Sequence, residues 1–194
     1  VIAALKIINR PHSITAEVEI PEGGAEGVTI SQGSIDGGYS FYFKDGRLQY
    51  RYNYVARTFF HAESTIAVPE GGHRLRVEFE VTGEPDILKG LGSPGRGQLY
   101  IDGQLVEKVE MSVTNSIMLD LASGVAVGAD PGSPVTDLYQ PPLEFTGKLH
   151  RVTFDVSGDL IRDSEAEMRS IMARQLSILQ PEFQTAQRVE RFSL

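Results

Sequence analysis

Two Asp-Gly dipeptides, Asp45-Gly46 and Asp102-Gly103, constrain the fold of this sequence more than any other feature. Each stands between two runs that suit a pleated strand, in "YSFYFKDGRLQYRY" and in "QLYIDGQLVEKVE". Asp-Gly favours a two-residue turn of type I′, because both central residues of that turn need positive φ. We therefore expect two β-hairpins, and a two-residue loop fixes the strand register of each.

In the first hairpin this register places Lys44 opposite Arg47 and Ser40 opposite Arg51. Because side chains alternate between the two faces of a strand, one face becomes almost entirely aromatic. That face carries Tyr39, Phe41, Phe43, Leu48, Tyr50 and Tyr52. Such a face could stack against sugars, but rings that bury so much apolar area favour a hydrophobic core. We expect this face to be core.

The opposite face of the first hairpin is polar and carries Tyr42, Gln49, Arg51 and Asn53. Hydroxyl, amide and guanidinium groups can hydrogen-bond a sugar beside one exposed ring. These four residues are therefore the candidate ligand-binding residues. The alternative is an ordinary solvated sheet face.

The second hairpin has apolar residues on both faces. The two-residue loop would place Leu99 opposite Val106 and Tyr100 opposite Leu105. Strands that are apolar on both faces are typical of covered positions in a sheet. We expect this hairpin to be central or covered rather than an open binding surface.

The rest of residues 1–158 also has strand character. Residues 13–20 and 74–81 alternate apolar and polar side chains, and the turns "PEGGAEG" and "PEGGH" punctuate the chain. Further strands are expected at residues 28–32, 59–64, 123–127 and 149–156. Many short strands without intervening helices predict an all-β fold, and we favour an antiparallel, two-sheet jelly-roll β-sandwich over residues 1–158.

After residue 158 the hydrophobic period changes to that of a helix. An apolar stripe and the capping-box pair Ser164 and Glu167 predict a C-terminal amphipathic α-helix over residues 159–180. Pro181 ends it, and residues 181–194 are expected to be a tail. An isolated helix of this length is marginally stable, so it should dock within the chain or against a second copy, as a dimer contact.

The composition excludes several classes of function. The formal charge of −8 and the lack of a basic cluster argue against a nucleic-acid partner. No apolar run is long enough for a transmembrane segment, and "VIAALKII" is too short for a signal peptide. Without cysteine there is neither disulfide nor thiolate chemistry. We interpret the chain as a fragment of a longer soluble protein whose compartment the sequence leaves open.

The sequence contains only weak candidates for catalytic or metal-binding motifs. The four histidines lack metal-ligand spacing, and there is no G-x-S-x-G elbow or phosphate-binding loop. The acidic loop "GADPGSPVTD" could hold Ca²⁺ through Asp130 and Asp137, although it falls short of an EF-hand loop. Glu78 and Glu80 share one face of a strand, which could suit a glycosidase, but alternation of charge explains them equally well.

Several long stretches resemble the C-terminal region of a group of large bacterial arylsulfatases. They include "NRPHSITAEVEIPEGGAEGV", "GGYSFYFKDGRLQYRYNY", "GQLYIDGQLV" and "GADPGSPVTDLYQPPLEFTGKLHRVTFDV", in order over residues 9–156. The resemblance implies a concanavalin-like, laminin-G-type jelly roll and a parent enzyme that hydrolyses sulfate esters. Sulfatases need a Cys/Ser-x-Pro-x-Arg motif, and the nearest match here, "GSPGRG", has Gly92 at the nucleophile position. No catalytic residue is therefore carried over.

Three functions follow, in order of preference. The first is a non-catalytic accessory domain that packs on the sulfatase catalytic domain of the same polypeptide and needs no cofactor of its own. The alternative is a carbohydrate-binding module that recognises glycans, including sulfated ones. The third, an independent hydrolase, has no convincing set of residues behind it.

Overall fold

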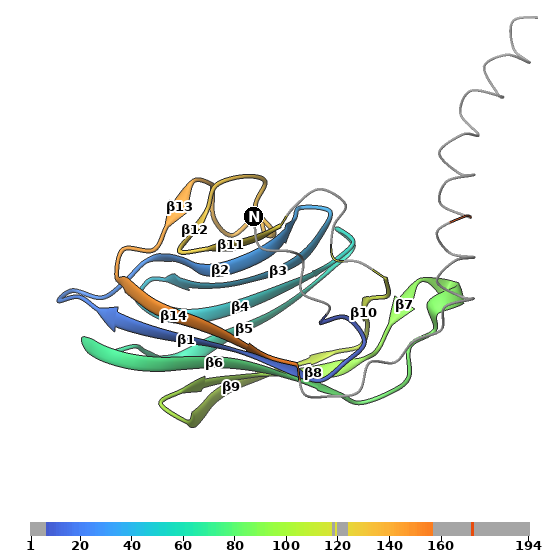
Figure 1. The fold of residues 1–194 in the computed structure, drawn as a ribbon, viewed down its shortest axis with the longest axis horizontal. Helices are drawn as coiled ribbons and strands as arrows, with labels where there is room; N and C mark the ends of the chain where they lie inside the picture. The colour runs from blue at the N-terminus through green and yellow to red at the C-terminus, as the bar shows by residue number, and fades with distance from the viewer. Residues whose placement is uncertain (1–6, 118, 120–123, 157–171, 173–194) are drawn as a thin grey trace, which may run out of the picture.

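Two twisted β-sheets face each other in a sandwich (Figure 1). The computed structural model describes residues 7–117, 119, 124–156 and 172. The five-stranded sheet has the order β14-β1-β6-β8-β9. Its strands are β1 (His12–Ile20), β6 (Gly71–Val81), β8 (Gly95–Ile101), β9 (Gln104–Met111) and β14 (Lys148–Asp155).

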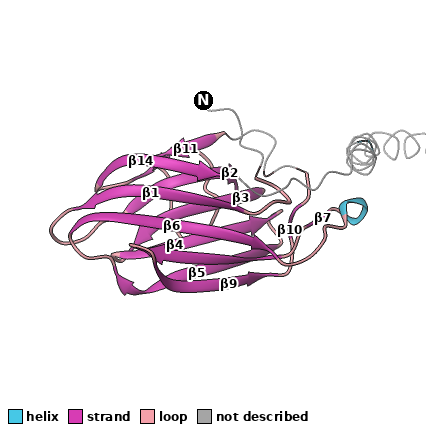
Figure 2. Cartoon of the chain, turned by 60° about the horizontal axis from the view of Figure 1, so that its bottom comes forward, coloured by secondary structure: helices cyan, strands magenta, loops and turns pink. Residues whose placement is uncertain are grey.

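The seven-stranded sheet has the order β12-β13-β2-β3-β4-β5, and β11 also pairs with β2. Its strands are β2 (Gly27–Ser34), β3 (Gly37–Lys44), β4 (Arg47–Tyr54), β5 (Thr58–Ala67), β11 (Val125–Val127), β12 (Ala129–Asp130) and β13 (Leu143–Glu144). All its pairs are antiparallel except β13 with β2. A small ribbon of β7 (Leu91–Gly92) and β10 (Thr114–Asn115) and the 3-10 turn η1 (Ile87–Lys89) lie at one end (Figure 2). The predicted all-β sandwich is confirmed.

The first Asp-Gly hairpin forms as its sequence predicts. Asp45 and Gly46 have φ of 53° and 70°, as a type I′ turn requires. The pairing runs from Lys44 with Arg47 to Ser40 with Arg51. The register inferred from this dipeptide is therefore confirmed.

The second hairpin departs from its prediction. Tyr100 does pair with Leu105, but a β-bulge follows, so that Leu99 pairs with Glu107 rather than Val106. The expected central or covered position is also wrong, because β9 is the edge strand of its sheet. Leu105 is 52% exposed. Apolar residues on both faces of a short strand therefore did not distinguish a covered strand from an edge strand.

The core lies between the two sheets. All six residues of the predicted aromatic face are buried there, which confirms that they are core rather than a sugar platform. They meet the apolar face of the five-stranded sheet, formed by Ile14, Ala16, Val18, Ile20, Leu75, Val77, Phe79, Leu99 and Ile101. This burial supplies the main stabilisation of the sandwich.

The predicted helix at residues 159–180 falls almost entirely outside the described residues, as does the tail at residues 181–194. A dimer contact through that helix stays a prediction for the same reason. In the part of the chain that is described, no helix has the length and apolar character needed to cross a membrane.

Candidate functional site

The polar face of the first hairpin is covered by the chain itself. The covering loop, residues 131–142 between β12 and β13, lies over β3 and β4 on the side away from the core. The Asn53 side-chain amide donates to the main-chain oxygen of Val135 in this loop and to those of Ser34 and Ile35. Its oxygen accepts from the amide of Ala56. Asn53 therefore works as an internal anchor.

Tyr139 fixes the middle of the covering loop. Its ring packs edge-on against Tyr42, with 5.1 Å between the ring centroids. Its hydroxyl donates to Oδ2 of Asp130 at 2.6 Å and lies 2.9 Å from the hydroxyl of Ser40. With Val28, the two tyrosines form a second, smaller buried cluster. The expectation of a solvated face is therefore wrong for Tyr42 and Asn53, which are both 0% exposed.

Arg51 and Gln49 lie at the margin of the covering loop. The guanidinium of Arg51 lies 4.8 Å from the ring centroid of Phe59 on β5 and faces Asp137 in the loop. Gln49 is buried, and its side-chain oxygen lies 3.0 Å from Nε2 of His61. Burial, assisted by the positive charge of Arg51, lowers the pKa of His61. Of the four predicted residues, Arg51 has the most access to solvent.

The two aspartates proposed for Ca²⁺ are engaged separately. Asp130 is buried and accepts the Tyr139 hydroxyl, whereas Asp137 is exposed and pairs with Arg51. Within residues 7–117, 119, 124–156 and 172, no group of three or more His, Asp or Glu side chains could hold a metal ion.

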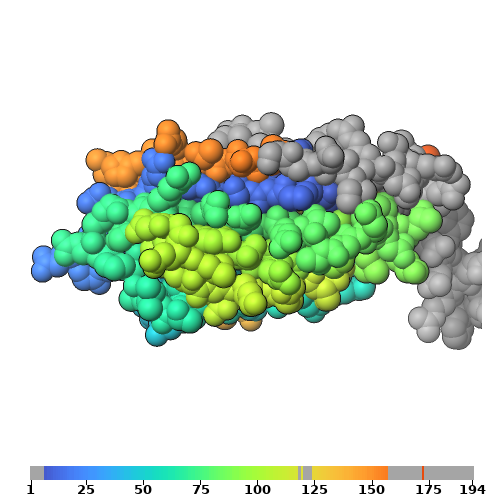
Figure 3. Space-filling view, turned by 90° about the horizontal axis from the view of Figure 1, so that it is seen from below, coloured from blue at the N-terminus to red at the C-terminus, as the bar shows by residue number. Residues whose placement is uncertain are grey.

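The five-stranded sheet presents an open cleft on its outer face. Figure 3 shows β14, β1, β6 and the β8–β9 hairpin side by side on the outside of the molecule. A cleft of about 330 Å³ on this outer face is lined by Arg74, Arg76, Tyr100, Asp102 and Gly103. We call it the β6–β8 cleft. Its size is at the lower end of the range for small-molecule sites.

Local pairing positions the side chains of the β6–β8 cleft. Arg76 pairs with Tyr100 across β6 and β8, and its guanidinium lies 4.3 Å from the centroid of the tyrosine ring. Glu78 holds the same guanidinium in an ion pair at 3.0 Å. Arg74 is two residues from Arg76, so both point to the same face, about 7 Å apart along the strand. The floor is therefore an aromatic ring with two guanidinium groups.

Asp102 closes one end of the cleft. Its Oδ1 accepts the main-chain amide of Arg74 at 2.8 Å, and its Oδ2 lies 2.7 Å from Nδ1 of His73. Partial burial alone would raise the pKa of Asp102, but the hydrogen bonds from Arg74 and His73 outweigh it and lower this pKa. The carboxylate is thus ionised and held in place at neutral pH.

A second hollow of about 160 Å³ continues from the other side of Arg76. Ser13, Glu78 and Asp155 line it with Arg76, among others. Arg76 therefore lines both hollows. The sequence predicted the outward direction of Arg74 and Arg76 from alternation, but it contained no signal that Tyr100 would lie beside them.

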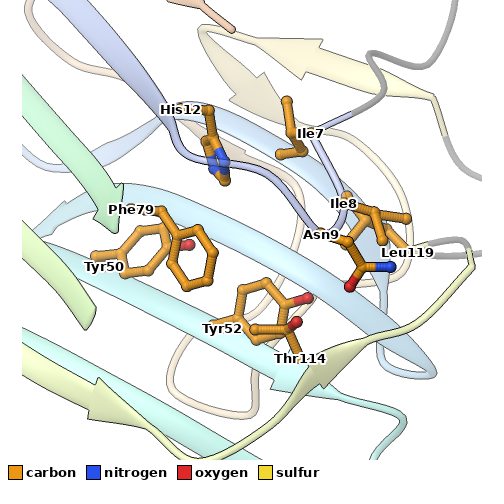
Figure 4. Close-up of a pocket in the computed structure, with 9 residues that line it drawn as sticks. All are labelled: Ile7, Ile8, Asn9, His12, Tyr50, Tyr52, Phe79, Thr114 and Leu119. Carbon is orange, nitrogen blue, oxygen red and sulfur yellow. The ribbon is translucent and has the colours of Figure 1, made fainter. Parts of the chain in front are cut away.

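A third cavity lies between the sheets, near the end of the sandwich (Figure 4). It is lined by Ile7, Ile8, Asn9, His12, Tyr50, Tyr52, Phe79, Thr114 and Leu119. Its volume of about 10 Å³ has room for about one water molecule. Burial lowers the pKa of His12 to about 4, so that the ring is neutral at pH 7. This cavity is too small for a sugar.

Comparison with known proteins gives the fold but no family. No protein-family model matches the chain, and no curated protein sequence matches it. Among solved structures, domains LG4-5 of the mouse laminin α1 chain match with a TM-score of 0.52 and 16% identity over 80% of this chain. The LG1-3 region of the laminin α2 chain matches with a TM-score of 0.56 and 12% identity, again over 80% of this chain.

This chain spans 40% and 30% of the lengths of those two laminin structures. The CBM40 of the Ruminococcus gnavus IT-sialidase, solved with α2,6-sialyllactose, matches with a TM-score of 0.51 and 13% identity. Here 85% of each chain is covered. These similarities establish that the described residues form a jelly-roll sandwich of the laminin G and CBM40 type, as the sequence resemblance implied for the fold.

Proposed function

We propose that this chain is a non-catalytic carbohydrate-binding domain that holds its glycan in the β6–β8 cleft. The observation that carries the proposal is the convergence of Arg74, Arg76, Tyr100 and Asp102 around one open cleft of about 330 Å³. Guanidinium groups donate to sugar hydroxyl oxygens, and a carboxylate accepts from sugar hydroxyl groups. The cleft therefore offers donors and an acceptor to the same ligand.

The rigidity of the cleft supports this proposal. Arg76 is held by the Tyr100 ring and by Glu78, and Asp102 is held by two hydrogen bonds. Groups that are already fixed lose little conformational freedom when a ligand binds. The CBM40 bound to α2,6-sialyllactose has the same type of fold, which supports the proposal by analogy.

The test is a glycan array of the folded domain, with sialylated, sulfated and neutral glycans, followed by calorimetry with the best ligand. Arg76→Ala should weaken binding by about tenfold or more, because hydrogen bonds to charged groups contribute about 1.5–3 kcal/mol. Arg96→Ala is the matched control. Arg96 is also a partly exposed arginine of the five-stranded sheet, but it pairs with Glu110 and does not line the cleft.

Arg96→Ala should change the dissociation constant less than about twofold. An equal loss for both variants would show that only overall charge matters. A blank array from a sample with a cooperative unfolding transition would contradict glycan binding itself.

A second proposal concerns the parent protein. We infer from the sequence resemblance that this domain belongs to the C-terminal region of a bacterial arylsulfatase, where it packs on the catalytic domain or brings it to sulfated glycans. The motif order over residues 9–156 supports this. Mixing the domain with such a catalytic domain and measuring association by sedimentation would test it, and the absence of a complex would count against the packing role.

A further inference from the structure

Arg51 carries more hydrogen-bonding capacity than the folded chain uses. Its side chain is 15% exposed and is held against the Phe59 ring. Its Nε atom is buried and has no hydrogen-bond partner among the described residues. A guanidinium presents five N–H donors in a fixed plane. Leaving a buried donor unpaired costs free energy, so this position needs an acceptor.

The partner that the chain supplies fits poorly. Asp137 Oδ1 lies 3.7 Å from Nη2 of Arg51, beyond the 2.7–2.9 Å of a charge-assisted hydrogen bond. The Asp137 side chain is 74% exposed, on the covering loop. This carboxylate is therefore near the guanidinium but only weakly bound to it.

A second unpaired group lies in the same place. Tyr42 is 0% exposed, and its hydroxyl has no hydrogen-bond partner in the described part of the chain. Tyr42 pairs with Gln49, two residues from Arg51 on the same face of the β3–β4 hairpin, and Arg51 in turn faces Asp137. Burial raises the pKa of Tyr42. The hydroxyl thus stays protonated and can donate. Two orphan donors and one loosely held carboxylate occur together.

We propose that Arg51 is the centre of a second site, which binds the carboxylate or sulfate group of an acidic sugar, and that Asp137 occupies this site when the ligand is absent. The planar guanidinium matches the oxygen pairs of both anions. The anionic group of the ligand would take the place of the Asp137 carboxylate beside the guanidinium and would satisfy the unpaired Nε of Arg51.

This site is independent of the β6–β8 cleft, because it lies on the other sheet of the sandwich. Its charge balance also depends on Asp137. Glu63 pairs with Arg47 at 3.3 Å, which leaves Asp137 as the anion paired with Arg51. Removing the Asp137 charge should therefore strengthen anion binding rather than weaken it.

The experiment measures binding of three probes to the folded domain by calorimetry: D-glucuronate, D-glucose 6-sulfate and D-glucose. Asp137→Asn should tighten binding of the charged probes by about two- to fivefold, because an exposed ion pair competes only modestly. Arg51→Gln should abolish this binding. Arg47→Gln, on the same strand, is the matched control and should leave it within about twofold of wild type.

A structural measurement separates loss of binding from loss of folding. Nitrogen-15 NMR of the arginine Nε–Hε groups should show a shift for Arg51 on titration with a charged probe, but not with glucose. Arg51→Lys retains the positive charge but not the planar guanidinium. This variant should fold normally and should bind the charged probes more weakly than wild type does. Binding of either charged probe supports the site and identifies the anionic group.

Equal binding of glucose would overturn the proposal, as would an Asp137→Asn variant with unchanged affinity. Anion binding that is lost in Arg76→Ala but retained in Arg51→Gln would place the ligand in the β6–β8 cleft instead. That result would overturn the second site while leaving the carbohydrate-binding function intact.

Discussion

The two outer faces of this sandwich look alike in sequence and differ in the folded chain. In β4 and in β6, polar and apolar residues alternate, with arginines on the polar side. Over β3 and β4 the covering loop buries that polar side, whereas over β6 and β8 it stays open as a cleft. Alternation therefore identifies the face that avoids the core, but it does not tell whether water or another segment covers that face.

The cover also changes what the polar residues do. Asn53 and Tyr42, in the covered face, contact the protein itself, whereas Arg74 and Arg76, in the open face, line a cleft. A buried polar group that is paired within the protein, such as the Asn53 amide, leaves its partners unpaired when it is removed, so its removal should destabilise the fold. Open groups exchange with water, so their removal should affect ligands more than stability. Each prediction below tests this difference.

Among substitutions on the two outer faces, the largest effect on stability is expected from Asn53→Ala. The Asn53 amide donates to three main-chain oxygens and accepts from Ala56. Its bonds to Ser34 and Val135 are buried, so the substitution leaves those two oxygens without a donor. We expect a loss of about 3 kcal/mol or more in the free energy of unfolding, measured by urea denaturation. Gln98→Ala, on the open face, should lose less than about 0.5 kcal/mol. Equal losses would remove the distinction between the faces.

Tyr139→Phe isolates one hydroxyl of the covered face. The ring still packs on Tyr42, but the buried carboxylate of Asp130 loses its 2.6 Å donor. An unpaired buried acceptor of this kind costs about 1–3 kcal/mol, and we expect about 2 kcal/mol from urea denaturation. Tyr100→Phe is the same change on the open face and should be nearly neutral. A neutral Tyr139→Phe would mean that water replaces the lost hydroxyl.

Local sequence rules predicted the parts of the fold that depend on neighbouring residues. The Asp45-Gly46 turn fixed its hairpin because positive φ at both positions admits one favoured turn. The next turn also has positive φ, at Val55 and Ala56, but neither residue type signals such a turn. The bulge at Val106 of β9, opposite Leu99 and Tyr100, likewise has no local marker.

The candidate sites depend on contacts between distant segments, which is why the sequence predicted only parts of them. Arg51 was found from hairpin register, but its neighbour Asp137 comes from a loop far along the chain. Tyr100 meets Arg76 only because β8 pairs with β6 across an irregular connection. Such pairings follow from packing of the whole sandwich, and no nearby pattern encodes them.

The free energy of unfolding should also depend on pH, through a histidine buried between the two sheets. The pKa of His12 falls from 6.5 to about 4 because burial disfavours the charged ring. Between these pH values the unfolded chain binds a proton that the folded chain does not, so stability falls as the pH drops. We expect a loss of about 1–2 kcal/mol between pH 7 and pH 5 in thermal or urea unfolding.

His12→Phe should make the free energy of unfolding less dependent on pH between pH 7 and pH 5. His61 also has a lowered pKa and acts in the same direction, so the difference between wild type and variant isolates His12. Glu17 and Asp102 have lowered pKa values too. Because they are carboxyl groups, their contribution to the stability of the fold is lost only at more acidic pH. A variant with the wild-type slope would show that His12 is hydrated in solution.

The smallest effect is expected at the edge of the open face. Leu105 on β9 is 52% exposed, so Leu105→Thr should change the free energy of unfolding by less than about 0.5 kcal/mol. Leu99, on the neighbouring strand β8, is 0% exposed, and Leu99→Ala should cost about 2–5 kcal/mol. A comparable loss at Leu105 in urea denaturation would mean that something covers β9 in solution. The covered hairpin that the apolar pattern predicts would then exist, with its cover supplied from outside the described residues.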